Sequence, residues 1–198
     1  YVVNEGEREP IDGKLIYRGI DLRDIVDACV REANRLIRDQ QEEQHCRMMT
    51  TLTLLRLSGA RAQLAYIGDT RIYWIRGGEI IYQSKDHSIP QMMVTCGEIT
   101  YDQIRGHESR NLLTRALGYK DDVTAEHFAG RIRRGDRLLL CTDGLTNMVA
   151  DDDIAQVLRE VPFFDATSIL VDRALQAGGQ DNITVLLMGV EATEVNNG

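Results

Sequence analysis

Two aspartates beside short apolar runs give the first indication of chemistry. Asp143 follows residues 138–141, a continuously apolar run behind the polar turn at 134–136, which is typical of a buried strand. Asp181 stands just before residues 183–188, a second β-prone run. Carboxylates at strand ends are held rigidly, and such oxygen ligands suit Mg²⁺ or Mn²⁺ better than zinc. The two can share a cation, although Asp-Gly after a strand is by itself more often a simple turn.

Further motifs accompany the two aspartates along the chain. They are Met48-Met49-Thr50-Thr51-Leu52, Ala65-Tyr66-Ile67-Gly68-Asp69-Thr70-Arg71-Ile72-Tyr73, Asp86-His87-Ser88, and Arg110-Asn111-Leu112-Leu113-Thr114-Arg115-Ala116-Leu117-Gly118. With the Asp143 and Asp181 segments, in this order across residues 24–190, they resemble the PPM, or protein phosphatase 2C, family of metal-dependent serine/threonine phosphatases in its bacterial form. One such motif is a weak signal, whereas the ordered set is specific.

The resemblance implies a centre of two or three Mn²⁺ or Mg²⁺ ions that hydrolyses phosphoserine and phosphothreonine in proteins with a metal-activated water. It places Asp143 and Asp181 on one of the two main ions. Asp69 matches a position that helps hold a weaker third ion together with the residue matching Asp143; a turn aspartate capping a hairpin is the alternative. The implied partner is a phosphorylated protein, of the kind that a serine/threonine kinase produces.

The N-terminal part departs from the family pattern. The family's bridging carboxylate belongs to an Asp-Gly-x-Gly-Gly motif, which this sequence does not contain. Asp12 stands in the only N-terminal Asp-Gly and is the candidate for this ligand, although it lies too close to Thr50 for the helix that follows the family motif. Three explanations stay open: the sequence omits residues of the natural enzyme, the chain is a divergent phosphatase, or it is a non-catalytic pseudophosphatase that keeps the fold for regulation or for binding phosphoproteins.

Histidines and arginines in the middle of the chain are less specific signals. We expect His87 and His107 to be structural hydrogen-bonding residues rather than general acids. The side chains of Arg105, Arg110 and Arg115 can meet a phosphate or an acidic neighbour, and the sequence does not decide between these. No cysteine or serine has a base motif around it, so covalent catalysis has no candidate nucleophile.

Composition bounds the class of protein. The 198 residues predict a single domain, 1–198, and 31 acidic against 23 basic residues give a net charge of −8, which argues against nucleic acid or an anionic membrane as the main partner. No apolar run is long enough for a membrane span, and no signal-peptide pattern opens the chain. The four cysteines form no CxxC pair, and Cys29 and Cys141 fall at apolar positions. We therefore expect both thiols to be buried and the protein to be cytoplasmic.

The elements that must position these residues predict an α+β fold. After Asp21 a helix is expected with Ile25, Cys29, Ala33 and Leu36/Ile37 on its core face, followed by a solvated connector at 40–44. Hairpin-connected strands of one meander are expected at 50–57, 62–67, 72–75 and 79–83.

The second half completes the expected layers. Residues 85–118, with short helical pieces at 89–96 and 101–106, correspond in the family to a flap subdomain beside the active site. Strands resume at 126–128, a solvated helix start is expected at 151–153, and a last helix within 164–177 has Ile169, Leu170, Ala174 and Leu175 as its core face. The predicted architecture is a four-layer α-β-β-α sandwich of two antiparallel sheets flanked by helices.

Overall fold

The computed structural model describes residues 10–11, 14–15 and 22–191. Its strands are β1 (Pro10–Ile11), β2 (Lys14–Leu15), β3 (Leu52–Ser58), β4 (Arg61–Ile67), β5 (Arg71–Arg76), β6 (Glu79–Gln83), β7 (Glu126–Arg131), β8 (Arg137–Cys141) and β9 (Val185–Gly189). Its helices are α1 (Leu22–Gln44), α2 (Ile89–Cys96), α3 (Asp143–Thr146), α4 (Asp151–Glu160) and α5 (Phe163–Gln176), and a 3₁₀ turn spans Tyr101–Gln103.

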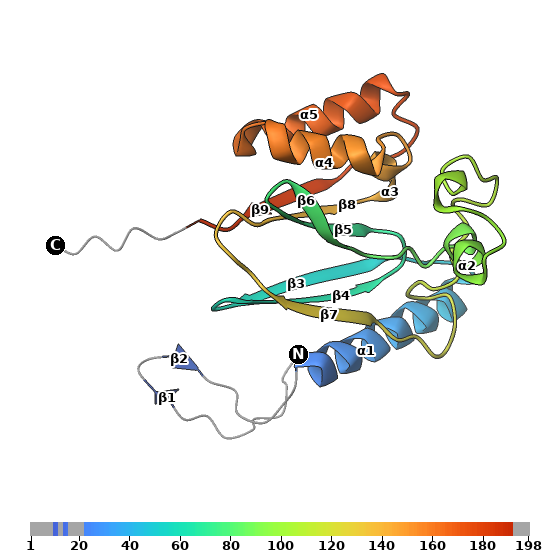
Figure 1. Ribbon diagram of the computed structural model, residues 1–198. Coiled ribbons are helices and arrows are strands. Elements are labelled where there is room, and N and C mark those ends of the chain that lie inside the picture. Colours follow the sequence, from blue (N-terminus) through green and yellow to red (C-terminus); the bar gives the residue numbers. More distant parts are fainter. Residues whose placement is uncertain (1–9, 12–13, 16–21, 192–198) are drawn as a thin grey trace.

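The main strands form two antiparallel sheets. The first has the strand order β3-β4-β7 and the second β6-β5-β8-β9. Helix α1 covers the outer face of the first sheet, and α4 and α5 cover the outer face of the second (Figure 1). The predicted architecture, a sandwich of two antiparallel sheets between helical layers, is therefore confirmed.

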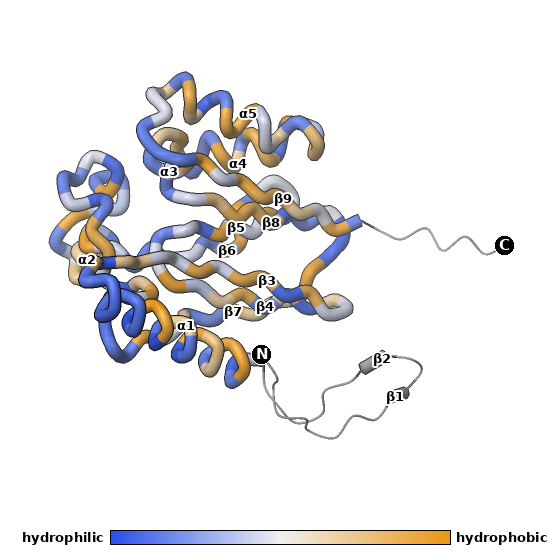
Figure 2. The backbone as a smooth tube through the Cα atoms, turned by 180° about the vertical axis from the view of Figure 1, so that it is seen from behind, coloured by the Kyte–Doolittle hydropathy of each residue, from blue (hydrophilic) through white to orange (hydrophobic). Residues whose placement is uncertain are grey.

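Alternating side chains on the central strands build three layers of core. In β5, Ile72 and Trp74 point between the sheets, whereas Tyr73 and Ile75 belong to the cluster under α4 and α5. Strand β8 alternates in the same way, and β4 divides its side chains between the inter-sheet core and the face under α1. A strand that is covered on both faces carries apolar side chains at successive positions, which explains why residues 138–141 are continuously apolar (Figure 2).

The chain changes sheet between β4 and β5, so the predicted single meander is wrong. Strand β4 ends in the first sheet at Ile67, and β5 begins in the second at Arg71. Gly68 makes this crossing possible, because its φ of 105° is open to glycine and a Cβ there would lie 2.3 Å from Cγ2 of Thr51. Asp69 consequently lies in a link between sheets, and the alternative that it caps a hairpin is also wrong.

Helix α1 differs from the prediction in length and in the face that it buries. It continues through the expected connector to Gln44, where the Gln40 side chain contacts Glu43 and Gln44 at helical spacing. Its core face consists of Val26, Val30, Ala33, Asn34 and Ile37. Ala33 and Ile37 are confirmed, whereas the first two turns bury the residue after the predicted one. Cys29 is therefore exposed, contrary to expectation, and Leu36 is 40% exposed, whereas Cys141 is buried as predicted.

Residues 85–118, called here the flap segment, leave the sandwich between β6 and β7 and lie at one end of it (Figure 1). Helix α2 occupies the predicted residues because Ser88 accepts a hydrogen bond from the Gln91 N–H at its start and Gly97, at φ 76°, ends it. Of the piece expected at 101–106, only one 3₁₀ turn forms. That the segment is a subdomain of its own stays a prediction.

The C-terminal half contains one unpredicted helix and one misplaced core residue. Helix α3 is a single four-residue turn directly after β8. In α5 the buried residues are Ala166, Leu170 and Ala174, while Leu175 is 57% exposed, so the predicted face is partly wrong. Ile169 does pack against the core.

Candidate metal centre

Asp143 and Asp181 lie on neighbouring segments, one just after β8 and the other just before β9, at the same end of the second sheet. Strands β8 and β9 are paired to their ends, and the pairing continues one residue further, where the Thr142 N–H donates to the Thr184 carbonyl at 3.1 Å. The Thr142 hydroxyl donates to the Asn182 carbonyl at 3.1 Å. These bonds join the segment that carries Asp143 to the segment that carries Asp181.

Gly144 allows the segments that carry Asp143 and Asp181 to touch. A Cβ on Gly144 would lie 2.2 Å from the carbonyl oxygen of Asn182 and 3.4 Å from the carbonyl carbon of Asp181. Asp143 does not end a strand: it is the first residue of α3, and its Oδ2 accepts a hydrogen bond from the Asn147 amide at 3.3 Å. The short helix therefore orients Asp143, and the Asn147 amide, four residues further along, holds its carboxylate in place.

Asp69 reaches the same region from the link between the sheets. The link is clamped by His87. Its ring Nδ1 accepts a hydrogen bond from the Gly68 N–H at 3.0 Å, and its backbone N–H donates to the Gly68 carbonyl at 2.9 Å. The His87 ring is buried and stacks on Tyr66, with centroids 5.2 Å apart. The expectation that His87 is a structural hydrogen-bonding residue is therefore confirmed.

The three aspartates interact electrostatically. Burial, and after it the charges of Asp143 and Asp86, raise the pKa of Asp69 to about 6. Burial and the charge of Asp181 also raise the pKa of Asp143. Asp181 is exposed, whereas Asp69 and Asp143 are partly buried. Partly buried carboxylates that repel one another are costly to the fold unless a cation lies between them. Their oxygen-only donor set fits a hard divalent cation such as Mg²⁺ or Mn²⁺.

The described residues do not supply a complete ligand set. Within residues 22–191 and the two short strands before them, no three His, Cys, Asp or Glu side chains gather into one metal-binding group. Asp12, the candidate for the bridging carboxylate, lies outside the described residues. The donors that the structure brings together are therefore the pair Asp143 and Asp181 and the pair Asp69 and Asp143.

A buried arginine next to the centre was missed by sequence reasoning. Arg71 forms a forked pair with Asp86 and donates from Nη1 to Oδ1 of Asp151 at 3.1 Å. Burial alone would raise the pKa of Asp151, but hydrogen bonding by Tyr73 and the charge of Arg71 lower it. Asp151 is therefore a structural hub and not a solvated residue. The rest of the expectation holds, because helix α4 starts at Asp151 and both Asp152 and Asp153 are exposed.

The signal for this hub was present in two motifs. Arg71 is the only cation of the Ala65–Tyr73 motif, and Asp86 is the only carboxylate of Asp86-His87-Ser88. The third member, Asp151, is 80 positions from Arg71, and its partners Gln83 and Tyr101 are likewise distant. Partners that are so far apart along the sequence produce no local sequence pattern that could predict their contact.

The remaining histidine and the arginines that the sequence analysis considered lie in the flap segment. His107 accepts a hydrogen bond from the Ser109 N–H at 3.1 Å, which confirms the structural role predicted for it. Arg110 donates to the Gln180 side chain at 2.9 Å, and Arg115 lies 4.0 Å from Glu126. Arg105 lines the pocket described below.

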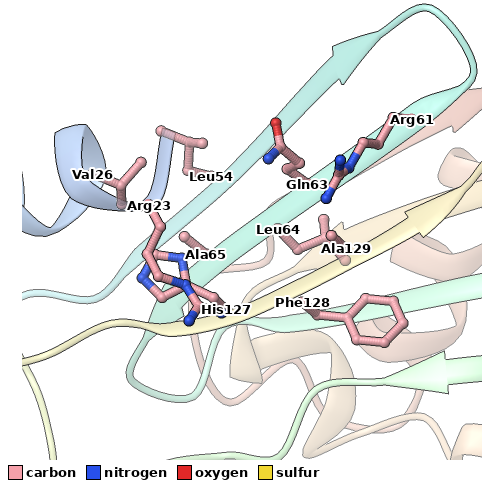
Figure 3. Close-up of a pocket in the computed structure, with 10 residues that line it drawn as sticks. All are labelled: Arg23, Val26, Leu54, Arg61, Gln63, Leu64, Ala65, His127, Phe128 and Ala129. Carbon is pink, nitrogen blue, oxygen red and sulfur yellow. The ribbon is translucent and has the colours of Figure 1, made fainter. Parts of the chain in front are cut away.

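Two pockets have different relations to the centre. One, of about 110 Å³, lies on the first sheet beside α1, and its described lining contains none of the candidate carboxylates (Figure 3). Another, of about 590 Å³, opens between the flap segment and the start of α4 and includes Arg71, Asn147 and Asp151.

None of the described helices is long and apolar enough to cross a membrane.

Two known proteins that are similar to this chain are named as protein phosphatases. Protein phosphatase PhpP of Streptococcus pneumoniae is 37% identical over 151 residues, which are 76% of this chain and 61% of that protein. The serine/threonine protein phosphatase PstP of Mycobacterium tuberculosis is 38% identical over 175 residues, which are 87% of this chain and 34% of that protein. The chain thus spans less than two thirds of the length of these curated relatives.

Solved structures agree with the fold. A crystal structure of the Mycobacterium tuberculosis phosphatase superposes with a TM-score of 0.79 at 37% identity, over 88% of this chain and 74% of that one. A structure of the catalytic domain of PstP in complex with two manganese ions superposes with a TM-score of 0.76 at 37% identity, over 89% and 74%. The model of the family described as protein phosphatase 2C matches residues 4–186. The chain therefore belongs to the protein phosphatase 2C family.

Proposed function

We propose that this chain carries the catalytic fold of a metal-dependent protein serine/threonine phosphatase. The observation that carries the proposal is that Asp143 lies close enough to both Asp181 and Asp69 for their charges to repel, beside the joined ends of β8 and β9. Family membership and relatives named as serine/threonine protein phosphatases support the same reaction.

Mn²⁺ or Mg²⁺, as two or three ions, is the proposed cofactor. Asp143 and Asp181 would hold one ion, and Asp69 with Asp143 would hold a weaker one. When bound, such cations screen the charge of a phosphate and acidify a water molecule that attacks it. The manganese ions in the PstP structure support this choice of metal. Asp12 stays the candidate for the remaining bridging ligand.

The chain's own contribution is to hold these oxygens in place. Asn147 orients Asp143, the Thr142 bonds join the Asp143 and Asp181 segments, and His87 clamps the link that carries Asp69. No cysteine or serine of the sequence stands in a recognisable base motif, so the chemistry that we favour is direct attack of water on a phosphate monoester.

The proposed substrate is a phosphoserine or phosphothreonine of a cytoplasmic protein, made by a serine/threonine kinase. Relatives named for this substrate class support it. All four cysteines are free thiols, which supports a reducing compartment.

Hydrolysis of p-nitrophenyl phosphate and of a phosphothreonine peptide, titrated with MnCl₂, tests the proposal. We expect manganese-dependent turnover that Asp143→Asn and Asp181→Asn each reduce by about a hundredfold or more, because even losing a residue that only orients a metal ligand costs about 10- to 100-fold. Asp153→Asn, at an exposed position of α4, is the matched control and should retain the activity. A folded protein with neither turnover nor a Mn²⁺-dependent rise in melting temperature would instead be a pseudophosphatase or an incomplete fragment.

A further inference from the structure

The pocket of about 590 Å³ between the flap segment and α4 lies next to the candidate centre through Asn147, which lines it and donates to Asp143, although none of the three candidate aspartates lines it. Tyr101 and Ile104 of the flap segment also line it, as do Ala150 and Asp152 at the start of α4. A chain whose phosphorylated residue is at the centre therefore has a neighbouring cavity for one of its flanking side chains.

The aromatic wall of the pocket is fixed in position. The Tyr101 hydroxyl donates to Oδ2 of Asp151 at 2.8 Å and accepts from the Gln83 amide at 2.7 Å. The Tyr101 residue is nevertheless 45% exposed, and Ile104 beside it is buried. The pocket thus offers a held aromatic ring and an apolar floor, which suit the aliphatic stem of a long side chain.

Charge around the pocket is mainly negative. Asp86 and Asp151 share one cation, Arg71. Asp102 and Asp152 stand at the rim with one further cation, Arg105. Asp86 itself does not line the pocket; among the residues that do, there are three carboxylates, Asp102, Asp151 and Asp152, and two cations, Arg71 and Arg105.

The rim carboxylates are also available to a ligand. Among the described residues, no hydrogen bond or ion pair occupies the carboxylate of Asp102 or of Asp152. The net charge of −8 on the whole chain adds a field of the same sign.

We propose that this pocket is a specificity subsite for an arginine or lysine that flanks the phosphorylated residue of the substrate protein, with the cationic head at Asp102 and Asp152 and the stem on Tyr101 and Ile104. The inference rests on the proposed phosphatase function and adds a substrate class to it. Arg105 opposes the preference from the same rim.

Phosphothreonine peptides with a single arginine, alanine or glutamate at each position from −3 to +3 test the subsite. We expect arginine at one or two positions to raise kcat/KM about fivefold over alanine at low salt, with glutamate lowering it, since two partly exposed ion pairs have this scale. In Asp102→Asn/Asp152→Asn the arginine-to-alanine ratio should fall towards one, and in Arg105→Ala it should rise. Asp153→Asn is the matched control, because Asp153 is exposed beside the pocket and does not line it.

Two readouts separate this inference from the proposed function. Turnover of p-nitrophenyl phosphate, which has no flanking side chain, reports the centre alone, and its absence would reject the phosphatase rather than the subsite. Fluorescence-anisotropy binding of the same labelled peptides, measured without turnover, still tests the subsite in that case. A preference for glutamate, equal binding of arginine and alanine peptides at every position, or an arginine preference unchanged in the double variant would overturn the inference.

Discussion

The guanidinium of Arg71 makes two parallel hydrogen bonds to the carboxylate of Asp86, from Nε to Oδ1 at 2.9 Å and from Nη2 to Oδ2 at 2.7 Å. The two side chains are only 10% and 11% exposed. The third guanidinium nitrogen reaches Asp151 at the start of α4. One cation thus joins the strand after the inter-sheet link, the beginning of the flap segment and the helix beside the pocket.

Replacing Arg71 by lysine should destabilise the protein markedly. Lysine keeps the charge but lacks the planar fork, so Asp86 and Asp151 cannot both stay paired. We expect the free energy of unfolding in urea to fall by about 2–4 kcal/mol, because partly buried carboxylates lose a partner. Arg159→Lys is the control: its pair with Glu160 joins exposed side chains and should change stability by less than about 0.5 kcal/mol. Equal losses in both variants would contradict the role of the fork.

Substituting Gly144 by alanine should separate the two aspartate loops. The new Cβ would meet the Asn182 carbonyl oxygen at 2.2 Å, and neither backbone can yield without moving Asp143 or Asp181. We expect a stability loss of about 1–3 kcal/mol and a much smaller Mn²⁺-dependent rise in melting temperature. Gly106→Ala, where a Cβ meets nothing within 4 Å, should behave like the parent protein in both measurements. A full manganese response in Gly144→Ala would show that the loops tolerate separation.

Elements whose ends are marked by turn or capping residues could be predicted from the sequence. Strand β6 and helix α2 occupy the expected residues 79–83 and 89–96. The reason is chemical: Gly77 and Gly78 take positive φ in the turn before β6, and Ser88 and Gly97 cap α2. The family motifs then named Asp69, Asp143 and Asp181 as a group, and burial and charge couple the same residues.

What the sequence could not reveal depends on partners far along the chain. The buried face of α1 is set by Asn34, whose amide donates to the carbonyls of Lys120 and Asp121 and whose oxygen accepts from the Gly118 N–H. A polar residue at the centre of a buried face breaks the hydrophobic periodicity, and the predicted face was therefore rotated onto Cys29. The sheet change after β4 was missed because strand propensity does not specify the pairing partner.

Replacing Asp69 by asparagine should stabilise the metal-free protein near neutral pH. The folded pKa of about 6 exceeds the ordinary 3.8, so the ionised carboxylate costs stability above pH 6, and this cost disappears below about pH 4. In EDTA we expect the variant to be more stable by roughly 1–3 kcal/mol at pH 7.5 and to show little gain at pH 4. Asp153→Asn should give no such pH-dependent gain. A destabilised Asp69→Asn at pH 7.5 without metal would mean that the carboxylate is a structural acceptor instead.

His87 should make the protein less stable as the pH falls from about 7 to 5. Burial lowers its pKa below 6.5, and the Gly68 N–H requires a neutral ring because Nδ1 must accept. The unfolded chain therefore takes up a proton before the folded one does, and stability is lost on acidification by at most about 1.4 kcal/mol per pH unit. His87→Asn keeps an acceptor for the Gly68 N–H but does not titrate. Urea denaturation from pH 5 to 8 should give a shallower slope for the variant below pH 7 and parallel curves above it, and equal slopes throughout would show that folding leaves the proton affinity of His87 unchanged.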